Sequence, residues 1–381
     1  MEKEQGRFAV DAGFPGGNII VDAVAGDRIS IRQDLRDTAG HWFYWCFRVR
    51  GAGGRTLEFQ FPEGNVIGVL GPAASFDAGA TWTWLGSAGE NAVSFRCQVP
   101  PGCAEARFSF GMPYTEANLR AFLARHAGNR HIEAKTLVTS RKGRTVELLR
   151  LGRLDGRCRH RVLLTARHHC CEMMASYSLE GIMEAVLAAD DRGRWFRENA
   201  EILVVPFMDK DGVEDGDQGK NRVPRDHGRD YLGKSLYPET AALRDLVPPW
   251  AQGRLHFAMD MHCPWIRDEH NEDVYFVGVE NAADSARLER FSKLLASVRR
   301  GPIPYSVSSN LSFGVDWNTA ENSKGGAGFH EWLGPLIAPG FVCSVEIPYA
   351  NAGGAEVNAA TARSLGTDLA AAIRAWLEAT G

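Results

Sequence analysis

The pattern of the chain changes near Pro113. Before this residue, short segments rich in aromatic and β-branched residues follow one another closely, with Gly, Pro, Asn or Asp between most of them. These segments are 42–51, 55–62, 65–72, 81–86, 91–100 and 105–113. Short strands at close spacing, separated by turn signals, are typical of an antiparallel sandwich. Residues 1–113 are therefore predicted to form an N-terminal β-sandwich domain.

The rest of the chain alternates between strand-like and helix-like segments. Residues 115–128, residues 172–190 and the C-terminal stretch have helical character. The strand candidates are 146–152, 161–167, 200–209, 255–264 and 341–349. This alternation predicts, over residues 114–381, an α/β domain with a mixed, mostly parallel sheet flanked by helices. In such a sheet the functional site lies outside the carboxyl ends of the strands.

Composition argues against several classes of function. A net charge of −4 over 381 residues gives no broad basic field, so no nucleic-acid partner is expected. No stretch approaches the roughly 18 apolar residues that a membrane span needs, and the charged N-terminus lacks the apolar part of an export signal. Eight cysteines without a Cys-x-x-Cys pair fit reduced thiols, so a cytoplasmic location is expected. Nothing in the sequence indicates an oligomeric state.

The strongest local signal follows the strand candidate 161–167, where His168, His169 and Glu172 precede a helix. Zinc takes imidazole nitrogen and carboxylate oxygen as ligands. A spacing of three residues allows His169 and Glu172 to face one point at a helix entry, whereas His168 is expected to point elsewhere. The same two residues, taken alone, also fit polar groups that cap a helix.

A third ligand has to come from another strand. His262 lies near the end of the strand candidate 255–264, in Asp260-Met261-His262, and Asp260 is placed to accept a hydrogen bond from a ligand or to line the site. His256 lies on the same strand and is the competing choice. A buried histidine that is hydrogen bonded to its neighbours is the alternative interpretation.

Two further features fit hydrolysis of an amide. The loop 206–231 contains Arg222, Arg225 and Arg229, which are suited to hold a carboxylate or to stabilise an oxyanion. A solvated charged loop would carry the same residues. Glu346 lies late in an apolar strand, where burial is costly unless the carboxylate is paired, and beside a metal it would serve as a general base. A strand-end glutamate facing solvent is the alternative.

The order of these segments resembles the zinc carboxypeptidase family, and within it the cytosolic carboxypeptidase branch. The matching segments are Ala166-Arg167-His168-His169-Cys170-Cys171-Glu172, the loop from Pro206 to Val213, Asp226-His227-Gly228-Arg229, Asp260-Met261-His262 and Ser344-Val345-Glu346. In the front part, WFYWCFRVRG, GPAASFDAGATWTWLG and MPYTEANL resemble the β domain of that branch. The resemblance thus covers nearly the whole chain and implies a zinc carboxypeptidase-like fold after the sandwich.

The resemblance also implies roles for the candidate residues. One Zn²⁺ per chain would be held by His169, Glu172 and His262, with Glu346 as general base. Asp226 would orient His169, and Arg229 would bind the carboxylate of a peptide substrate. Arg222 would polarise the scissile carbonyl, with Arg225 as the competing choice. The expected activity is therefore a metallocarboxypeptidase that releases a C-terminal or side-chain-linked amino acid.

Departures from the family pattern keep other functions open. Gly228 replaces the asparagine that helps to hold a C-terminal carboxylate, Cys170-Cys171 replaces Pro-Gly, and the tyrosine that contacts substrate has only Tyr231, Tyr305 and Tyr349 as candidates. The first departure favours a zinc amidohydrolase or deacylase that acts on a non-peptide or cell-wall amide. A non-catalytic binding protein, with the sandwich as its recognition module, is the third hypothesis.

Overall fold

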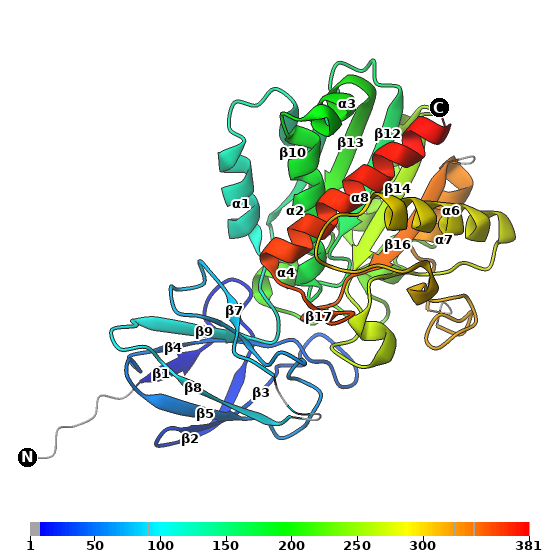
Figure 1. Cartoon of the computed structure of the whole chain (residues 1–381). Helices are drawn as coiled ribbons and strands as arrows, with labels where there is room; N and C mark the ends of the chain where they lie inside the picture. Colours follow the sequence, from blue (N-terminus) through cyan, green and yellow to red (C-terminus); the bar gives the residue numbers. More distant parts are fainter. Residues whose placement is uncertain (1–7, 88, 90–91, 323–324, 338–339, 381) are drawn as a thin grey trace, which may run out of the picture.

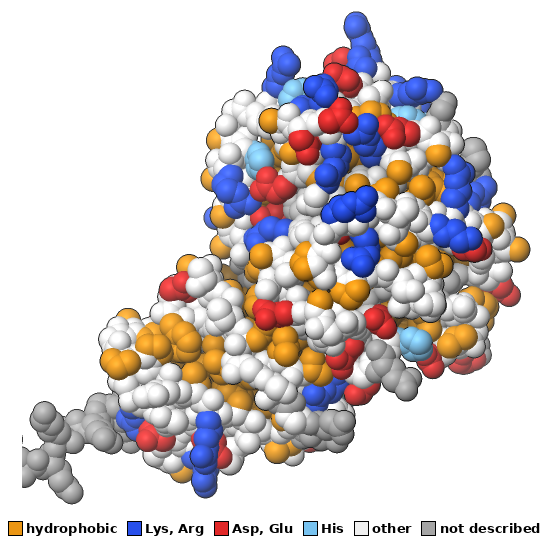
Figure 2. All heavy atoms as spheres, viewed as in Figure 1, with side chains coloured by type: hydrophobic (Ala, Val, Ile, Leu, Met, Phe, Trp, Pro, Cys, Tyr) orange, Lys and Arg blue, Asp and Glu red, His pale blue; other side chains and the backbone are white. Residues whose placement is uncertain are grey.

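Two bodies of unequal size lie side by side in the computed structural model, which describes residues 1–381 except 1–7, 88, 90–91, 323–324, 338–339 and 381 (Figure 1). The smaller body contains β1 to β9, and the larger contains all the labelled helices. Over the face seen in Figure 2, acidic and basic side chains are interspersed on the larger body, in agreement with a net charge of only −4. Of the described helices, none is both long and apolar enough to cross a lipid bilayer.

The smaller body is a sandwich of two sheets. One has the order β1-β4-β9-β6-β7, with all neighbours antiparallel, and the other has the order β2-β3-β5-β8. Their strands are β1 Ala9–Asp11, β2 Ile20–Ala25, β3 Arg28–Arg32, β4 Cys46–Arg50, β5 Thr56–Gln60, β6 Ala73–Ser75, β7 Thr83–Trp84, β8 Ser94–Gln98 and β9 Glu105–Ser109. Alternate residues point inward, so Phe47 of β4 packs 5.0 Å from Phe59 of β5, ring centre to ring centre.

The predicted sandwich is confirmed, with two differences. β3 pairs with β5 in parallel, so the second sheet is not wholly antiparallel. The segment 65–72 is not a strand, because Asn65 and Gly71 have positive φ and Pro72 follows them, although Val66 and Ile67 are buried as an apolar strand would be. The boundary near Pro113 stays a prediction.

The larger body is built on a seven-stranded sheet of order β10-β11-β13-β12-β14-β16-β15. Its strands are β10 Ile132–Thr139, β11 Thr145–Gly152, β12 His160–Ala166, β13 Ala200–Val205, β14 Leu255–His262, β15 Tyr275–Phe276 and β16 Phe341–Glu346. The central strands β13, β12, β14 and β16 are parallel, and antiparallel strands complete both edges. β12 and β13 are buried along their whole length, as expected for parallel strands covered on both faces.

Helices cover both faces of this sheet. On one face, α2 (Met173–Leu187) packs closely on α8 (Ala359–Thr380), which runs across the front of Figure 1, and α3 (Asp191–Asn199) and α6 (Ala282–Val298) lie on the same side. Gly181 and Gly366 allow the close approach, because a Cβ on either would lie 2.0 Å from a carbonyl oxygen of the other helix. On the opposite face, α5 (Pro238–Ala251) and α7 (Phe329–Ile337) form a second core with Leu163 and Leu203.

Candidate metal centre

Three of the predicted residues converge at the carboxyl ends of neighbouring strands. His169 and Glu172 follow β12, and His262 ends β14, which pairs with β12 in parallel. Nδ1 of His169 lies 2.9 Å from Oε1 of Glu172, and Nδ1 of His262 lies 2.9 Å from Oε2. The three side chains offer ligand atoms within 4.8 Å of one another. Glu172 is fully buried at the N-terminal end of α2.

The turn that delivers these residues has a specific local cause. Arg167, directly after β12, has φ 63 and is fully buried, so the chain reverses sharply before the helix. Its guanidinium Nε donates to the carbonyl of Cys170 at 2.9 Å, and NH1 donates to the carbonyl of Tyr114 at 2.8 Å. These bonds hold the turn in a conformation that non-glycine residues seldom adopt.

A carboxylate lies beside the second nitrogen of each imidazole ring, within hydrogen-bond distance for His262 and at ion-pair distance for His169. Nε2 of His262 lies 2.7 Å from Oδ2 of Asp260, and Nε2 of His169 lies 3.8 Å from Oδ1 of Asp226. Each ring therefore turns its Nδ1 toward Glu172 and its other nitrogen toward an acid, as metal-binding histidines do in proteins. Two imidazole nitrogens and one carboxylate at the wall of a cavity fit a zinc ion that keeps one coordination position open.

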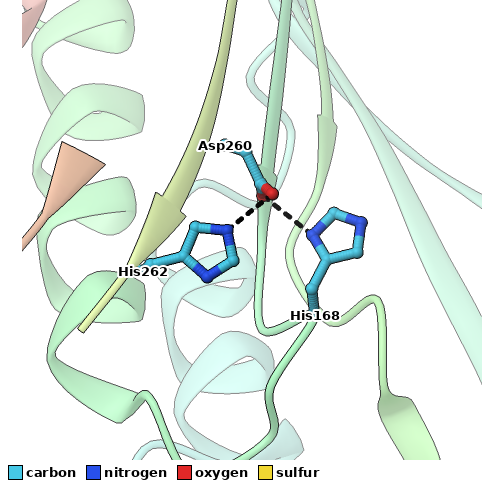
Figure 3. Close-up of side chains that lie close together, drawn as sticks. All are labelled: His168, Asp260 and His262. Carbon is cyan, nitrogen blue, oxygen red and sulfur yellow. Dashed lines mark hydrogen bonds and ion pairs between the residues drawn. The ribbon is translucent and has the colours of Figure 1, made fainter. Parts of the chain in front are cut away.

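A second group, His168, Asp260 and His262, shares His262 with the first (Figure 3). Asp260 stands between the two rings, and its Oδ1 lies 2.8 Å from Nδ1 of His168 and also accepts from the hydroxyl of Thr165. Nε2 of His168 lies 2.6 Å from the hydroxyl oxygen of Tyr231. Burial alone would raise the pKa of Asp260, but His168 and His262 lower it well below its usual range. Because both nitrogens of His168 are engaged, this group acts as a support for His262.

Glu346 lies at the end of β16, directly opposite His262 of β14. Its carboxylate is buried, and Oε2 has no hydrogen-bond partner among the described residues. Burial raises the pKa of Glu346 to about 7, although His262 and Lys220 act in the opposite direction. The side chain is thus a carboxyl group that takes up or releases a proton near neutral pH.

The three predicted arginines have different surroundings. Arg222 is ion-paired with three carboxylates: Nε lies 3.0 Å from Asp37, NH1 2.7 Å from Asp209 and NH2 3.0 Å from Asp217. Nε of Arg225 donates to Asp230 at 2.7 Å. Arg229 lines the cavity, and its guanidinium makes no hydrogen bond or ion pair with a described residue, although its charge contributes to the lowered pKa of Asp226.

Lys220 is a residue of the site that the sequence did not indicate. Its Nζ lies 2.5 Å from Oε1 of Glu172 and 5.4 Å from the centre of the Trp42 ring. Only 15% of its side chain is exposed. Its single signal in the sequence is its place in the loop 206–231, two residues before Arg222.

These groups share one cavity of about 1450 Å³. Its lining includes His169, His262, Glu346, Lys220 and Arg229, and the buried Glu172 contacts the first two and Lys220. Trp42, Trp265 and Trp317 contribute aromatic walls, and Asp226 and Asp260 also reach it. In the described part of its lining, none of the three tyrosine candidates, Tyr231, Tyr305 and Tyr349, occurs. A Cβ on Gly228 would lie 3.0 Å from Nε2 of His169, so this residue packs directly against the ring.

Comparisons with known proteins agree with the family resemblance noted in the sequence. The family model described as zinc carboxypeptidase matches residues 119–240. An uncharacterized protein of Zymomonas mobilis is 25% identical over 81% of this chain and 79% of its own length. Cytosolic carboxypeptidase 3 of Bos taurus is 23% identical over 57% of this chain, and the match spans only 22% of that relative.

A solved structure adds the fold. The metallo-carboxypeptidase from Burkholderia cenocepacia is 19% identical and superposes with a TM-score of 0.79, covering 98% of this chain and 100% of the other. The predicted α/β fold and the predicted zinc cofactor are confirmed at this level, since the matched family is a zinc family and the described residues include a fitting donor group. In sequence and in fold, the chain resembles the zinc carboxypeptidases, and among them the cytosolic carboxypeptidases.

Proposed function

We propose that the chain is a zinc metallocarboxypeptidase that hydrolyses the amide bond next to a free carboxylate and so releases a C-terminal or side-chain-linked amino acid. His169, Glu172 and His262 hold the ion. The observation that carries the proposal is the arrangement of one cavity. Among the described residues, it combines this donor group with the buried carboxylate of Glu346 and the guanidinium of Arg229, neither of which is ion-paired there.

Zinc, when bound, lowers the pKa of a coordinated water and polarises a carbonyl. Asp260 and Asp226 keep the two rings in the orientation in which Nδ1 is available. Glu346 takes a proton from the attacking water and passes it to the leaving amine. Without the ion the pKa of Glu346 is about 7, and a dication nearby shifts it toward the carboxylate, the form that accepts the proton of the water.

Two cations have separate tasks in this proposal. Arg229 binds the carboxylate of the substrate, because its planar donor group lines the cavity and makes no ion pair or hydrogen bond with a described residue. Lys220 polarises the scissile carbonyl, because its ammonium already lies beside Glu172. The sequence favoured Arg222 for this second task, with Arg225 as its competitor. We prefer Lys220, since its one ionic partner among the described residues is Glu172, which the metal would engage, whereas Arg222 would have to leave three carboxylates and Arg225 would have to leave Asp230.

The deciding experiment compares matched peptides with free and amidated C-termini, using the zinc-loaded chain. Cleavage of the free form at least about 100-fold faster is expected, because a charged pair with Arg229 is lost on amidation. Glu346→Gln should abolish turnover of both peptides while zinc stays bound. Equal rates on the two peptides would refute a carboxypeptidase and support the second candidate, a zinc amidohydrolase or deacylase.

One observation favours that second candidate. Gly228 places no side chain beside His169 and Asp226, where an asparagine would add a donor for the substrate carboxylate. Small acylated amines and cell-wall peptides are its natural test substrates. A non-catalytic role would require that no amide in such a panel is hydrolysed and that Glu346→Gln binds ligand unchanged. We further propose a cytoplasmic location, because all eight cysteines are free thiols.

A further inference from the structure

The loop that presents Lys220 is held mainly by the sandwich domain. Nδ2 of Asn18 donates to the carbonyl of Gly216 at 2.7 Å. The side chain of Gln218 accepts from the backbone N–H of Tyr44 at 2.8 Å and donates to its carbonyl at 2.9 Å. The hydroxyl of Thr38 donates to the carbonyl of Lys220 itself. Residues among the first 44 therefore contact this loop at Gly216, Gln218 and Lys220.

Asp37 makes the central contact. Its Oδ1 accepts from the backbone N–H of Gln218 at 3.0 Å, and its Oδ2 accepts from the N–H of Gly219 at 2.9 Å. Oδ2 also accepts from Nε of Arg222 at 3.0 Å. One carboxylate thus holds the N–H groups of the two residues immediately before Lys220 and the arginine two residues after it.

The opposite side of the loop is packed against the metal centre. Gly219 has φ +75, and a Cβ there would lie 2.4 Å from the backbone nitrogen of Cys170 and 3.2 Å from the carbonyl carbon of His169. The loop therefore lies between Asp37 on one side and the segment that carries His169 on the other. Lys220 is the next residue, and its ammonium lies between Trp42 of the sandwich domain and Glu172.

We propose that Asp37 is a positioning residue for Lys220, so that the sandwich domain builds part of the active site instead of serving as a separate recognition module. This inference rests on the proposed function only where it assigns Lys220 to the reaction. The physical reason is that a short loop with both peptide groups held by one acid has little freedom, so the distance of the ammonium from Glu172 is set by Asp37. A displacement of about 1 Å in a catalytic group is enough to lower a rate about 100-fold.

The test is a pair of isosteric variants of the full-length chain, Asp37→Asn and Asp34→Asn. Asp34 is the matched control, because its carboxylate contacts only Arg36 among the described residues, through the N–H at 3.0 Å and NH1 at 3.0 Å. Asp37→Asn should lower kcat/KM about 10- to 100-fold, and Asp34→Asn should change it less than about threefold. Both should keep zinc, because neither side chain contacts a proposed ligand. Lys220→Arg should retain more activity than Lys220→Met.

A double-mutant cycle distinguishes a role of Asp37 in positioning Lys220 from a general loss of fold stability. In the Lys220→Met background, Asp37→Asn should have little further effect, since the group that Asp37 positions is gone. Equal fold losses in both backgrounds would overturn the inference.

Amide hydrogen exchange tests the structural part without any assay of activity. Exchange at Gln218 and Gly219 should be faster in Asp37→Asn than in Asp34→Asn, and equal protection would also overturn the inference. A wild-type chain that binds zinc but hydrolyses no peptide would count against the proposed function alone, because the exchange measurement still decides on Asp37.

Discussion

His262 and Glu346 are direct neighbours across β14 and β16, at the last paired position of both strands. Nδ1 of His262 faces Glu172, and Oε2 of Glu346 has no hydrogen-bond partner among the described residues. The backbone hydrogen bonds between the two strands connect these two side chains, so their relative position does not depend on a loop. Groups on adjacent strand ends keep a fixed separation, so the proposed metal ligand and the proposed general base need no rearrangement to act together.

The donor group makes a direct prediction about metal content. His169→Ala and His262→Ala should each lower bound zinc from about one per chain to near zero, because two remaining ligands hold the ion poorly. His256→Ala is the control, since this histidine lies on the same strand as His262 but its Nδ1 faces Nδ1 of His160 at 3.0 Å. Metal analysis after dialysis measures the result. Zinc lost from His256→Ala and kept by His262→Ala would reverse the assignment.

Glu346 should weaken the metal-free fold above neutral pH. Its pKa rises from 4.5 to about 7 on folding. Its favourable contribution to the free energy of unfolding is therefore complete below pH 4.5 and is lost as the pH rises through about 7. The difference corresponds to about 3 kcal/mol at most. Glu346→Gln should therefore be more stable than the metal-stripped wild type at pH 8 by about 2–3 kcal/mol and equally stable at pH 4. Urea unfolding at the two pH values would measure this, and equal stability at pH 8 would contradict it.

Arg229 should set the preference for a free carboxylate. Arg229→Met is expected to lower kcat/KM on a free C-terminal peptide by about 100-fold or more and to change the amidated peptide little, because only the former loses a charge-assisted pair. Arg225→Met serves as the comparison, since its partner is Asp230. If Arg225→Met removes the preference and Arg229→Met does not, the carboxylate is bound by Arg225 instead.

Two glycines with the same backbone conformation should respond differently to alanine. A Cβ on Gly219 (φ +75) would lie 2.4 Å from the backbone nitrogen of Cys170, whereas a Cβ on Gly233 (φ +63) would have no described atom within 4 Å. Gly233→Ala should lower the free energy of unfolding by about 1 kcal/mol through backbone strain alone. Gly219→Ala adds a steric clash and should lower it by about 3 kcal/mol or more. Thermal and urea unfolding would compare them; an equal loss would show that the loop moves away freely.

The buried His160 and its half-buried neighbour His256, which do not line the cavity, predict a second acid-sensitive point of the fold. Burial and the neighbouring His256 lower the pKa of His160 from 6.5 to about 4. The neutral form of His160 therefore stabilises the folded state fully above pH 6.5. This contribution is lost as the pH falls toward 4, which lowers the free energy of unfolding by about 2 kcal/mol after allowance for solvent screening. In His160→Gln the slope of unfolding free energy against pH between 6.5 and 4 should be shallower. An unchanged slope would show that other groups dominate the acid response.

The ends of strands explain why much of the site could be found in the sequence. His169, Glu172, His262 and Glu346 each occur where an apolar run stops, and parallel strands bring their carboxyl ends to one edge. The family resemblance is confirmed by sequence and fold. The individual roles of these residues stay predictions, although the structure brings them together.

The features that the sequence did not predict depend on contacts between residues far apart in the chain. Lys220 was missed because its position depends on Asp37 and Thr38, which lie 182 residues before Gly219 and Lys220 respectively, and no local pattern records such a bond. β2 and β3 were not expected, so the parallel pairing of β3 with β5 was not either. Arg222 looked suitable by residue type, but its acidic partners are Asp37, Asp209 and Asp217, whose convergence only the fold reveals.

The close packing of α8 on α2 has a consequence for how the protein is made. α2 begins at the residue after Glu172, and the glycine contact that seats it comes from Gly366, near the end of the chain. A growing polypeptide on the ribosome has the early ligands long before it has the helix that holds them in place. The packing that holds the start of α2 in place is therefore completed only after Gly366 has been synthesised, and a nascent chain that lacks α8 is expected to bind the ion more weakly.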